Sequence, residues 1–133
     1  MHDNGGWEID SHSYRVLHLL RTGADAHGLY PSRNAKLLDA SIRNAGSISV
    51  VSFRRRRVVA MVRIPGGGSP DMCGVSAEGK VLWLTGLYKA VVYAISTRTG
   101  RLLAKILVGQ SRHGLCVWPQ PGRYSLGHTG ILR

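Results

Sequence analysis

The stretch 66–109, GGGSPDMCGVSAEGKVLWLTGLYKAVVYAISTRTGRLLAKILVG, contains four short apolar runs separated by turn residues. These runs are Met72–Ser76, Lys80–Thr85, Val91–Ser96 and Arg101–Val108. They are rich in β-branched and aromatic residues, and the connections between them contain Gly79 and Gly100, which suit tight hairpin loops. No part of the chain keeps a period of 3.6 over ten or more residues, so no helix is expected. The stretch therefore predicts four consecutive β-strands.

The same unit recurs along the chain. AKLLDAS at 35–41 matches GKVLWLT at 79–85, a shift of 44 residues, and matches GRYSLGH at 122–128 more loosely. SISVVSFRRRRVVAMVRI at 47–64 matches AVVYAISTRTGRLLAKILV at 90–108, which WEIDSHSYRVLHLL at 7–20 also resembles. Four short strands in each repeat of this length are typical of a β-propeller blade.

The predicted fold is all-β, a partial β-propeller built of four-stranded antiparallel blades. With the strands of a blade lettered A to D from the central channel outwards, residues 7–20 supply strands C and D of a first blade. Residues 21–64 form a second blade and 65–108 a third. Residues 109–133 supply strands A and B of a last blade, at Gly114–Trp118 and Arg123–Gly127.

The unit at 66–109 resembles the YVTN-type β-propeller repeat, whose pattern runs roughly G-x-x-P-x-G-V-A-V-S-P-D-G-K-x-L-Y-V-T-N and then V-x-V-I-D-T-x-T-x-x-V. The likeness extends over nearly all of the chain from Trp7 onwards. It departs where Asn34 and Glu78 stand in place of the turn aspartate of the pattern, and where Ser96 stands in place of a later aspartate. Asp39 also stands where an aromatic or aliphatic strand residue is expected, and an unpaired buried carboxylate would weaken that blade.

Twelve predicted strands amount to three blades, whereas propellers usually close with four to eight. One interpretation is a piece of a longer, seven-bladed propeller. Another is a head-to-tail homodimer, in which strands A and B of one chain join strands C and D of another to make a six-bladed ring. A third outcome, an aggregated product, follows if the apolar blade faces stay open.

The repeat alignment places His27, Asp71 and His113 at equivalent points just before strand A. We therefore expect them to approach one another at the channel rim and to form a ligand-binding site. Such a set could hold a divalent metal or polarise an anionic group. The local sequence lacks metal-ligand spacing, so neither a metal nor a cofactor is predicted, and polar residues lining a wet channel are the simpler interpretation.

The sharpest charge feature is a run of four arginines at a predicted exposed turn between strands C and D. Its members are Arg54, Arg55, Arg56 and Arg57. The chain carries 18 Lys and Arg against 7 Asp and Glu, a formal charge of +11, which favours polyanionic partners. The run could contact phosphates of a nucleic acid or another anionic polymer, with help from Arg15, Arg21, Arg43 and Arg63. A solvated loop is the alternative.

The function predicted from the sequence is a non-catalytic binding scaffold for a protein or an anionic polymer. The resemblance implies a bacterial or archaeal protein that is often exported, but no signal peptide or membrane span is expected here, so the chain as written would be cytoplasmic. Two alternatives stay open. One is a lactonase-like hydrolase with its site at the channel mouth, which the resemblance suggests, and the other is nucleic-acid binding through the arginine run.

Overall fold

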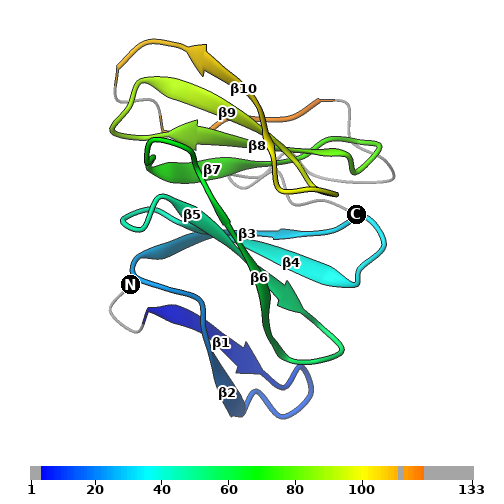
Figure 1. The fold of residues 1–133 in the computed structure, drawn as a ribbon. Helices are drawn as coiled ribbons and strands as arrows, with labels where there is room; N and C mark the ends of the chain where they lie inside the picture. Colours follow the sequence, from blue (N-terminus) through cyan, green and yellow to red (C-terminus); the bar gives the residue numbers. More distant parts are fainter. Residues whose placement is uncertain (1–3, 111–112, 119–133) are drawn as a thin grey trace.

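The computed structural model describes residues 4–110 and 113–118, and these residues form ten strands and no helix. A two-stranded sheet comprises β1 (Gly5–Ile9) and β2 (Val16–Arg21). The next sheet comprises β3 (Ala26–Pro31), β4 (Leu37–Ile42), β5 (Ser47–Ser52) and β6 (Arg57–Arg63), in that order. The third comprises β7 (Pro70–Val75), β8 (Val81–Gly86), β9 (Val91–Ser96) and β10 (Leu102–Leu107). All neighbouring strands are antiparallel (Figure 1).

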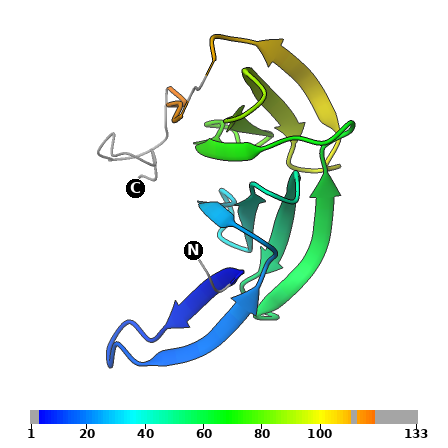
Figure 2. The same ribbon diagram turned by 90° about the vertical axis from the view of Figure 1, so that its left-hand side faces the viewer.

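The sheets follow one another around an arc, with β3 and β7 on its inner side and β6 and β10 on its outer side (Figure 2). This is the arrangement of β-propeller blades, whose first strands line the central channel. The all-β, four-stranded antiparallel architecture predicted from the repeat is therefore confirmed. The two four-stranded sheets lie inside the ranges 21–64 and 65–108.

Matched hydroxyl groups explain why the repeat folds the same way twice. Ser32 Oγ accepts from Leu37 N at 3.0 Å, and Ser76 Oγ accepts from Val81 N at 3.0 Å, so each closes the turn after an inner strand. One strand further on, Ser41 Oγ accepts from Gly28 N at 2.8 Å. These local bonds satisfy backbone donors where the ladder has gaps.

The main core lies between the two four-stranded sheets. Its members share near-complete burial: Tyr30, Ile48, Ile64, Val75, Leu82, Leu84, Val91, Tyr93 and Ile95. Arg33 adds polar links across the same boundary, because its Nε and Nη2 donate to the carbonyls of Ser76 and Val75 at 3.0 and 2.5 Å. The two sheets therefore pack as neighbours with fixed spacing.

Asp39 lies in β4, half-buried in a groove of about 350 Å³ whose wall includes Leu37, Ile48 and Leu82. Burial raises the pKa of its carboxyl to about 6. Among the described residues none is found to bond to this carboxylate. β4 forms despite it, so the unexpected aspartate does not abolish the strand.

The last predicted blade differs from the structure where it is described. Residues 113–118 form no strand, in contrast to the strand predicted at Gly114–Trp118, and its predicted neighbour Arg123–Gly127 lies outside the described residues. A strand exists only through hydrogen bonds to such a neighbour. Segment 115–118 nevertheless shares a groove of about 360 Å³ with Trp83 and Val92. Trp118, at the end of the predicted strand, is 64% exposed.

Candidate functional site

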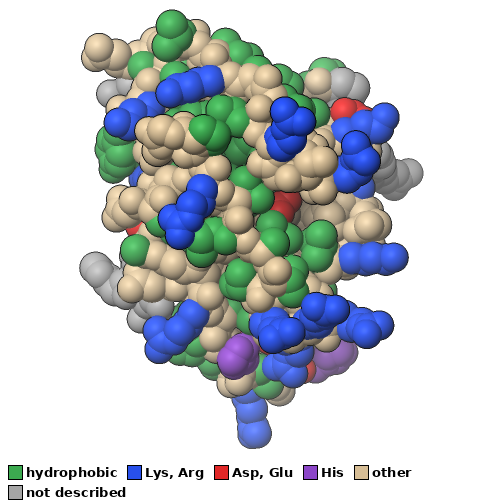
Figure 3. Space-filling view, viewed as in Figure 1, with side chains coloured by type: hydrophobic (Ala, Val, Ile, Leu, Met, Phe, Trp, Pro, Cys, Tyr) green, Lys and Arg blue, Asp and Glu red, His purple; other side chains and the backbone are tan. Residues whose placement is uncertain are grey.

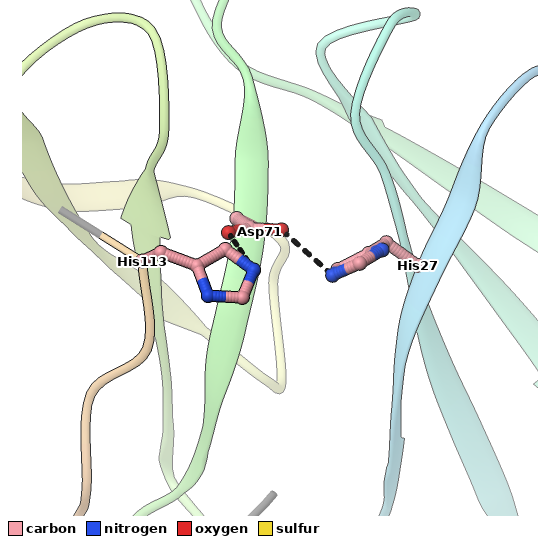
Figure 4. Close-up of side chains that lie close together, drawn as sticks. All are labelled: His27, Asp71 and His113. Atoms are coloured by element: carbon pink, nitrogen blue, oxygen red, sulfur yellow. Dashed lines mark ion pairs between the residues drawn. The ribbon is translucent and has the colours of Figure 1, made fainter. Parts of the chain in front are cut away.

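Three side chains from separate segments meet at the inner side of the arc, and together they form what we call the rim cluster: His27, Asp71 and His113 (Figure 4). His27 belongs to β3 and Asp71 to β7, whereas His113 precedes the segment 114–118. The three positions are equivalent in the sequence repeat, and repetition of one backbone path around the arc brings them together. This explains why His-Gly-Leu is found at both 27–29 and 113–115.

Asp71 lies between the two imidazoles. His27 Nε2 is 3.1 Å from Asp71 Oδ1, and His113 Nε2 is 3.5 Å from Asp71 Oδ2. The two ring centroids are 5.9 Å apart at an angle of 64°. One donor atom from each of the three residues lies within 4.8 Å of the other two. The cluster therefore surrounds a single small volume.

The Asp71 carboxylate is fully buried, with 0% of its side chain exposed. Within the described part of the chain, neither of its oxygens has a partner with the directional geometry of a hydrogen bond, despite the short distances to the imidazoles. A hydrogen bond weakens steeply when it is misaligned, so these short distances alone do not satisfy the carboxylate. A buried carboxylate without aligned donors is costly unless a charge compensates it.

The backbone of Asp71 is held firmly by the preceding sheet. Its carbonyl oxygen accepts from Ser41 Oγ at 2.8 Å and from Tyr30 Oη at 3.2 Å, and Tyr30 Oη in turn accepts from Cys73 N at 3.0 Å. Burial raises the pKa of Tyr30 to about 12, so its hydroxyl keeps the proton that it donates. The position of the carboxylate is thus set by β3 and β4 as well as by β7.

Arg43 was assigned from sequence to an anionic-polymer surface, but the structure places it beside the rim cluster. Its Nε lies 3.1 Å from Asp25 Oδ2 and 3.8 Å from Asp71 Oδ1. The signal for this position is the β3–β4 register, in which Ala26 is opposite Ile42. That pairing brings the residues just outside the two strands, Asp25 and Arg43, side by side.

The surroundings of His27 disfavour its protonated form. Burial lowers its pKa, an effect opposed by the Asp71 carboxylate and reinforced by the charges of Arg43 and His113. Arg43 Nη2 lies 2.6 Å from His27 Nδ1. A guanidinium can only donate, so Nδ1 is the acceptor and the ring proton lies on Nε2, which is close to the Asp71 carboxylate but not aligned with it.

The predicted arginine run is exposed. Arg54, Arg55 and Arg56 lie in the β5–β6 loop, and Arg57 begins β6. Arg56 Nε donates to Glu8 Oε2 at 2.9 Å, so one of the four already has an acidic partner. A groove of about 340 Å³ beside the run is lined by His18, Leu19, Leu20, Arg21, Arg56, Arg57 and Val58. Basic side chains are spread over the face shown in Figure 3 and gather towards its lower end.

The fold and the inner-edge cluster define a segment of a β-propeller with polar residues at the start of its channel-side strands. The family model described as YNCE-like beta-propeller matches residues 6–122, and the chain belongs to this family. No curated protein matches its sequence.

Solved structures share the fold at low identity. Virginiamycin B lyase from Staphylococcus aureus is 12% identical with a TM-score of 0.68, and 83% of this chain covers 37% of that one. Dihydro-heme d1 dehydrogenase NirN is 18% identical with a TM-score of 0.67, and 88% of this chain covers 26% of that one. Kuenenia stuttgartiensis hydrazine synthase is 16% identical with a TM-score of 0.67, and 77% of this chain covers 29% of that one. The chain thus spans between about a quarter and two fifths of these proteins, and the likeness establishes the fold alone.

No helix among residues 4–110 and 113–118 has the length and apolarity required to cross a bilayer.

Proposed function

We propose that the chain is a non-catalytic binding scaffold of the β-propeller type, and that its ligand site is the rim cluster. The observation that carries the proposal is the Asp71 carboxylate, which is fully buried and flanked by two imidazoles, yet lacks an aligned hydrogen-bond donor among the described residues. Buried polar groups that the protein leaves unsatisfied are frequently completed by a ligand, ion or water. Convergent polar groups on rigid strands are also the usual composition of a binding site.

Thermal unfolding of the full chain tests this proposal. The probes are acetate, citrate, inorganic phosphate, Mg²⁺, Ca²⁺ and Zn²⁺, each added separately. We expect at least one to raise the unfolding temperature of the wild type and to lose this effect in His113→Gln, because a ligand that binds only the folded state stabilises it. His113 is 44% exposed, so its replacement leaves the core intact.

His12→Gln is the matched control, since His12 is exposed in the turn between β1 and β2, away from the cluster. An equal shift in His113→Gln and in the wild type for every probe would overturn the rim cluster as the site. Turnover of a simple lactone by the wild type, lost in Asp71→Asn, would replace the binding role with the hydrolase alternative.

A second candidate function is binding of an anionic polymer in the groove beside the arginine run. Its support is the convergence of Arg21, Arg56 and Arg57 on one groove with His18. Binding of a single-stranded oligonucleotide should weaken steeply as the salt concentration rises. The double variant Arg21→Ser, Arg57→Ser should lower the slope of log affinity against log salt concentration by about 1 to 2, since up to two phosphate contacts are lost. A salt-independent affinity would remove this candidate.

We also propose that the two four-stranded sheets are whole blades and that β1 and β2 are the outer half of another. Apolar side chains on this half-blade support the idea that a further sheet covers it, because Trp7, Val16 and Leu17 are more than half exposed. A second copy of the chain is one source of that sheet, and the rest of a longer propeller is the other. Light scattering at twice the 14.5 kDa chain mass would support the first.

A further inference from the structure

We propose that the rim cluster is a binding site for a divalent transition metal of the Zn²⁺ class, with His27 Nε2, His113 Nε2 and the Asp71 carboxylate as its three protein ligands. This inference rests on the rim cluster being the ligand site, and it names the ligand. Two imidazoles and one carboxylate suit Zn²⁺ and its neighbours better than Mg²⁺ or Ca²⁺, which prefer oxygen ligands only.

The spacing of the donors fits such an ion after a small contraction. A tetrahedral Zn²⁺ with bonds of about 2.0–2.1 Å separates its ligands by roughly 3.4 Å. The observed contacts of 3.1 and 3.5 Å from Asp71 to the imidazoles already have this separation. The largest separation in the set, within 4.8 Å, must shorten, and His113 can supply that movement because it is the most exposed member.

The misalignment of the short contacts gives an independent reason. The nitrogens approach the Asp71 oxygens without pointing at them as hydrogen-bond donors. The three residues therefore do not satisfy one another by hydrogen bonds, and one ligand atom from each lies within 4.8 Å of the other two. Asp71 is held in this position by the bonds from Tyr30 and Ser41 to its backbone, so the site is largely formed before an ion arrives.

The local charge also favours a cation. Two carboxylates, Asp25 and Asp71, share one guanidinium, Arg43, which lies closer to Asp25. These two carboxylates and one guanidinium leave one negative charge in excess beside the fully buried carboxylate. A divalent ion converts this excess to one positive charge, and the fourth coordination position can then bind water or an anionic group of a partner.

Arg43 opposes the metal. Coordination through Nε2 requires that nitrogen to lose its proton, so a neutral His27 must carry its proton on Nδ1 instead. Nδ1–H would then face the Arg43 amino group, 2.6 Å away, and two donors repel. Arg43 must therefore turn away, and we expect it to lower the metal affinity. Zinc-bound histidines usually donate their second N–H to a carbonyl or carboxylate, and Arg43 cannot accept it.

This opposition provides a test that a variant failing to fold cannot mimic. The full chain carries Cys116→Ser throughout, because Cys116 is an exposed thiol that could bind zinc by itself. After removal of metal with a chelator, Zn²⁺ is titrated calorimetrically and Co²⁺ is used as a spectroscopic probe. We expect one ion per chain, with the intense visible absorption of tetrahedral Co²⁺. We also expect His113→Gln to lose binding and His12→Gln, at an exposed histidine in the turn between β1 and β2, to retain it.

The decisive variant is Arg43→Gln, whose side-chain carbonyl can accept from Nδ1–H. We expect it to bind Zn²⁺ about tenfold more tightly, the lower end of the usual effect of groups that contact metal ligands. Absence of stoichiometric binding in both the Cys116→Ser chain and Arg43→Gln would overturn the metal site, as would undiminished binding in His113→Gln. If Zn²⁺ does not bind while citrate or phosphate still stabilises the chain through His113, the proposed metal site is wrong and the proposed binding function stands.

Discussion

The two four-stranded sheets have nearly the same backbone and different side chains where they meet their neighbours. Ser41 in one and Thr85 in the other have matching roles, since each hydroxyl accepts from the backbone of the strand beside it, at Gly28 N and Met72 N. Asp39 in β4 corresponds to Trp83 in β8, and both face a groove beside the next segment along the arc. The comparison separates residues that make a blade from residues that adapt one blade to its surroundings.

A second pair of positions shows this adaptation more sharply. The sheet β3–β6 has Gly28 and Tyr30 where the sheet β7–β10 has Met72 and Gly74. A Cβ at Gly28 would lie 2.0 Å from Tyr30 Oη, whereas one at Gly74 would meet only Val117, at 3.9 Å. Large and small side chains therefore alternate between two positions on the same face, and the Tyr30 hydroxyl that positions Asp71 requires glycine at 28.

Gly28→Ala reduces the difference between the two sheets at this position and is expected to have the largest effect on stability. The added methyl group overlaps the Tyr30 ring and must displace it from Asp71 and Cys73. We expect a loss of about 3 kcal/mol or more in the free energy of unfolding, because overpacking a well-filled core usually costs 1–3 kcal/mol and here two hydrogen bonds are also lost. Urea denaturation measures it.

The double variant Gly28→Met, Tyr30→Gly copies the sister sheet and controls for volume. Its cost should be smaller than the sum of the two single variants, since the clash is removed. Additive costs would show that Gly28 and Tyr30 are not coupled.

Asp39→Leu should sharpen the comparison by making β4 more like β8. The folded pKa, about 6, lies above the usual aspartate value of 3.8, so the folded state holds a proton that the unfolded state has released. Stability from this group is therefore lost as pH rises from about 4 to about 6. We expect Asp39→Leu to stabilise the chain by about 2 kcal/mol at pH 7.5, and by much less at pH 4.

Asp39→Asn is the control for charge, because it keeps the shape and removes the titration. It should flatten the same part of the pH profile. A wild-type free energy of unfolding that does not change between pH 4 and pH 6 would contradict the raised pKa of the Asp39 carboxyl in this groove.

The sequence predicted the blades well because their signal is local and repeated. The apolar runs and the serines that close the turns, Ser32 and Ser76, recur with the same shift, and the structure follows them. The meeting of His27, Asp71 and His113 was also predictable, since equivalent positions of successive blades are neighbours. Arg43 and Asp25 were not found, because their place depends on the β3–β4 register and on a side-chain direction that the repeat does not encode.

Trp118 and the segment 114–118 show the opposite limit. Their sequence matches an inner strand, but strand formation depends on a neighbouring chain segment, and the local pattern alone cannot provide it. Trp83 shares its groove with segment 115–118, whereas Asp39, at the equivalent position, shares one with Leu82 and Ile95 of the next sheet. These surroundings are outside the repeat.

The smallest expected effect concerns the outer turns. Arg56 has a φ of 49°, in the left-handed region, at the position where the sister turn has Gly100 with a φ of 70°. Arginine in this conformation costs about 1 kcal/mol relative to glycine. Arg56→Gly also loses the exposed pair with Glu8, which contributes only about 0–1 kcal/mol. We therefore expect a net gain of about 0.5 kcal/mol, measured by urea denaturation at 0.5 M salt, where the ion pair is screened.

Arg54→Gly is the matched control, because Arg54 lies in the same turn without a positive φ among the residues described, and it should give no gain. A loss in Arg56→Gly at high salt would mean that the Glu8 contact, rather than the turn, determines the identity of this residue. The arginine run would then hold β1 against the neighbouring sheet through Arg56. A gain would mean that the turn tolerates arginine at a cost, which is the result expected if exposed charge at this turn was retained for binding rather than for folding.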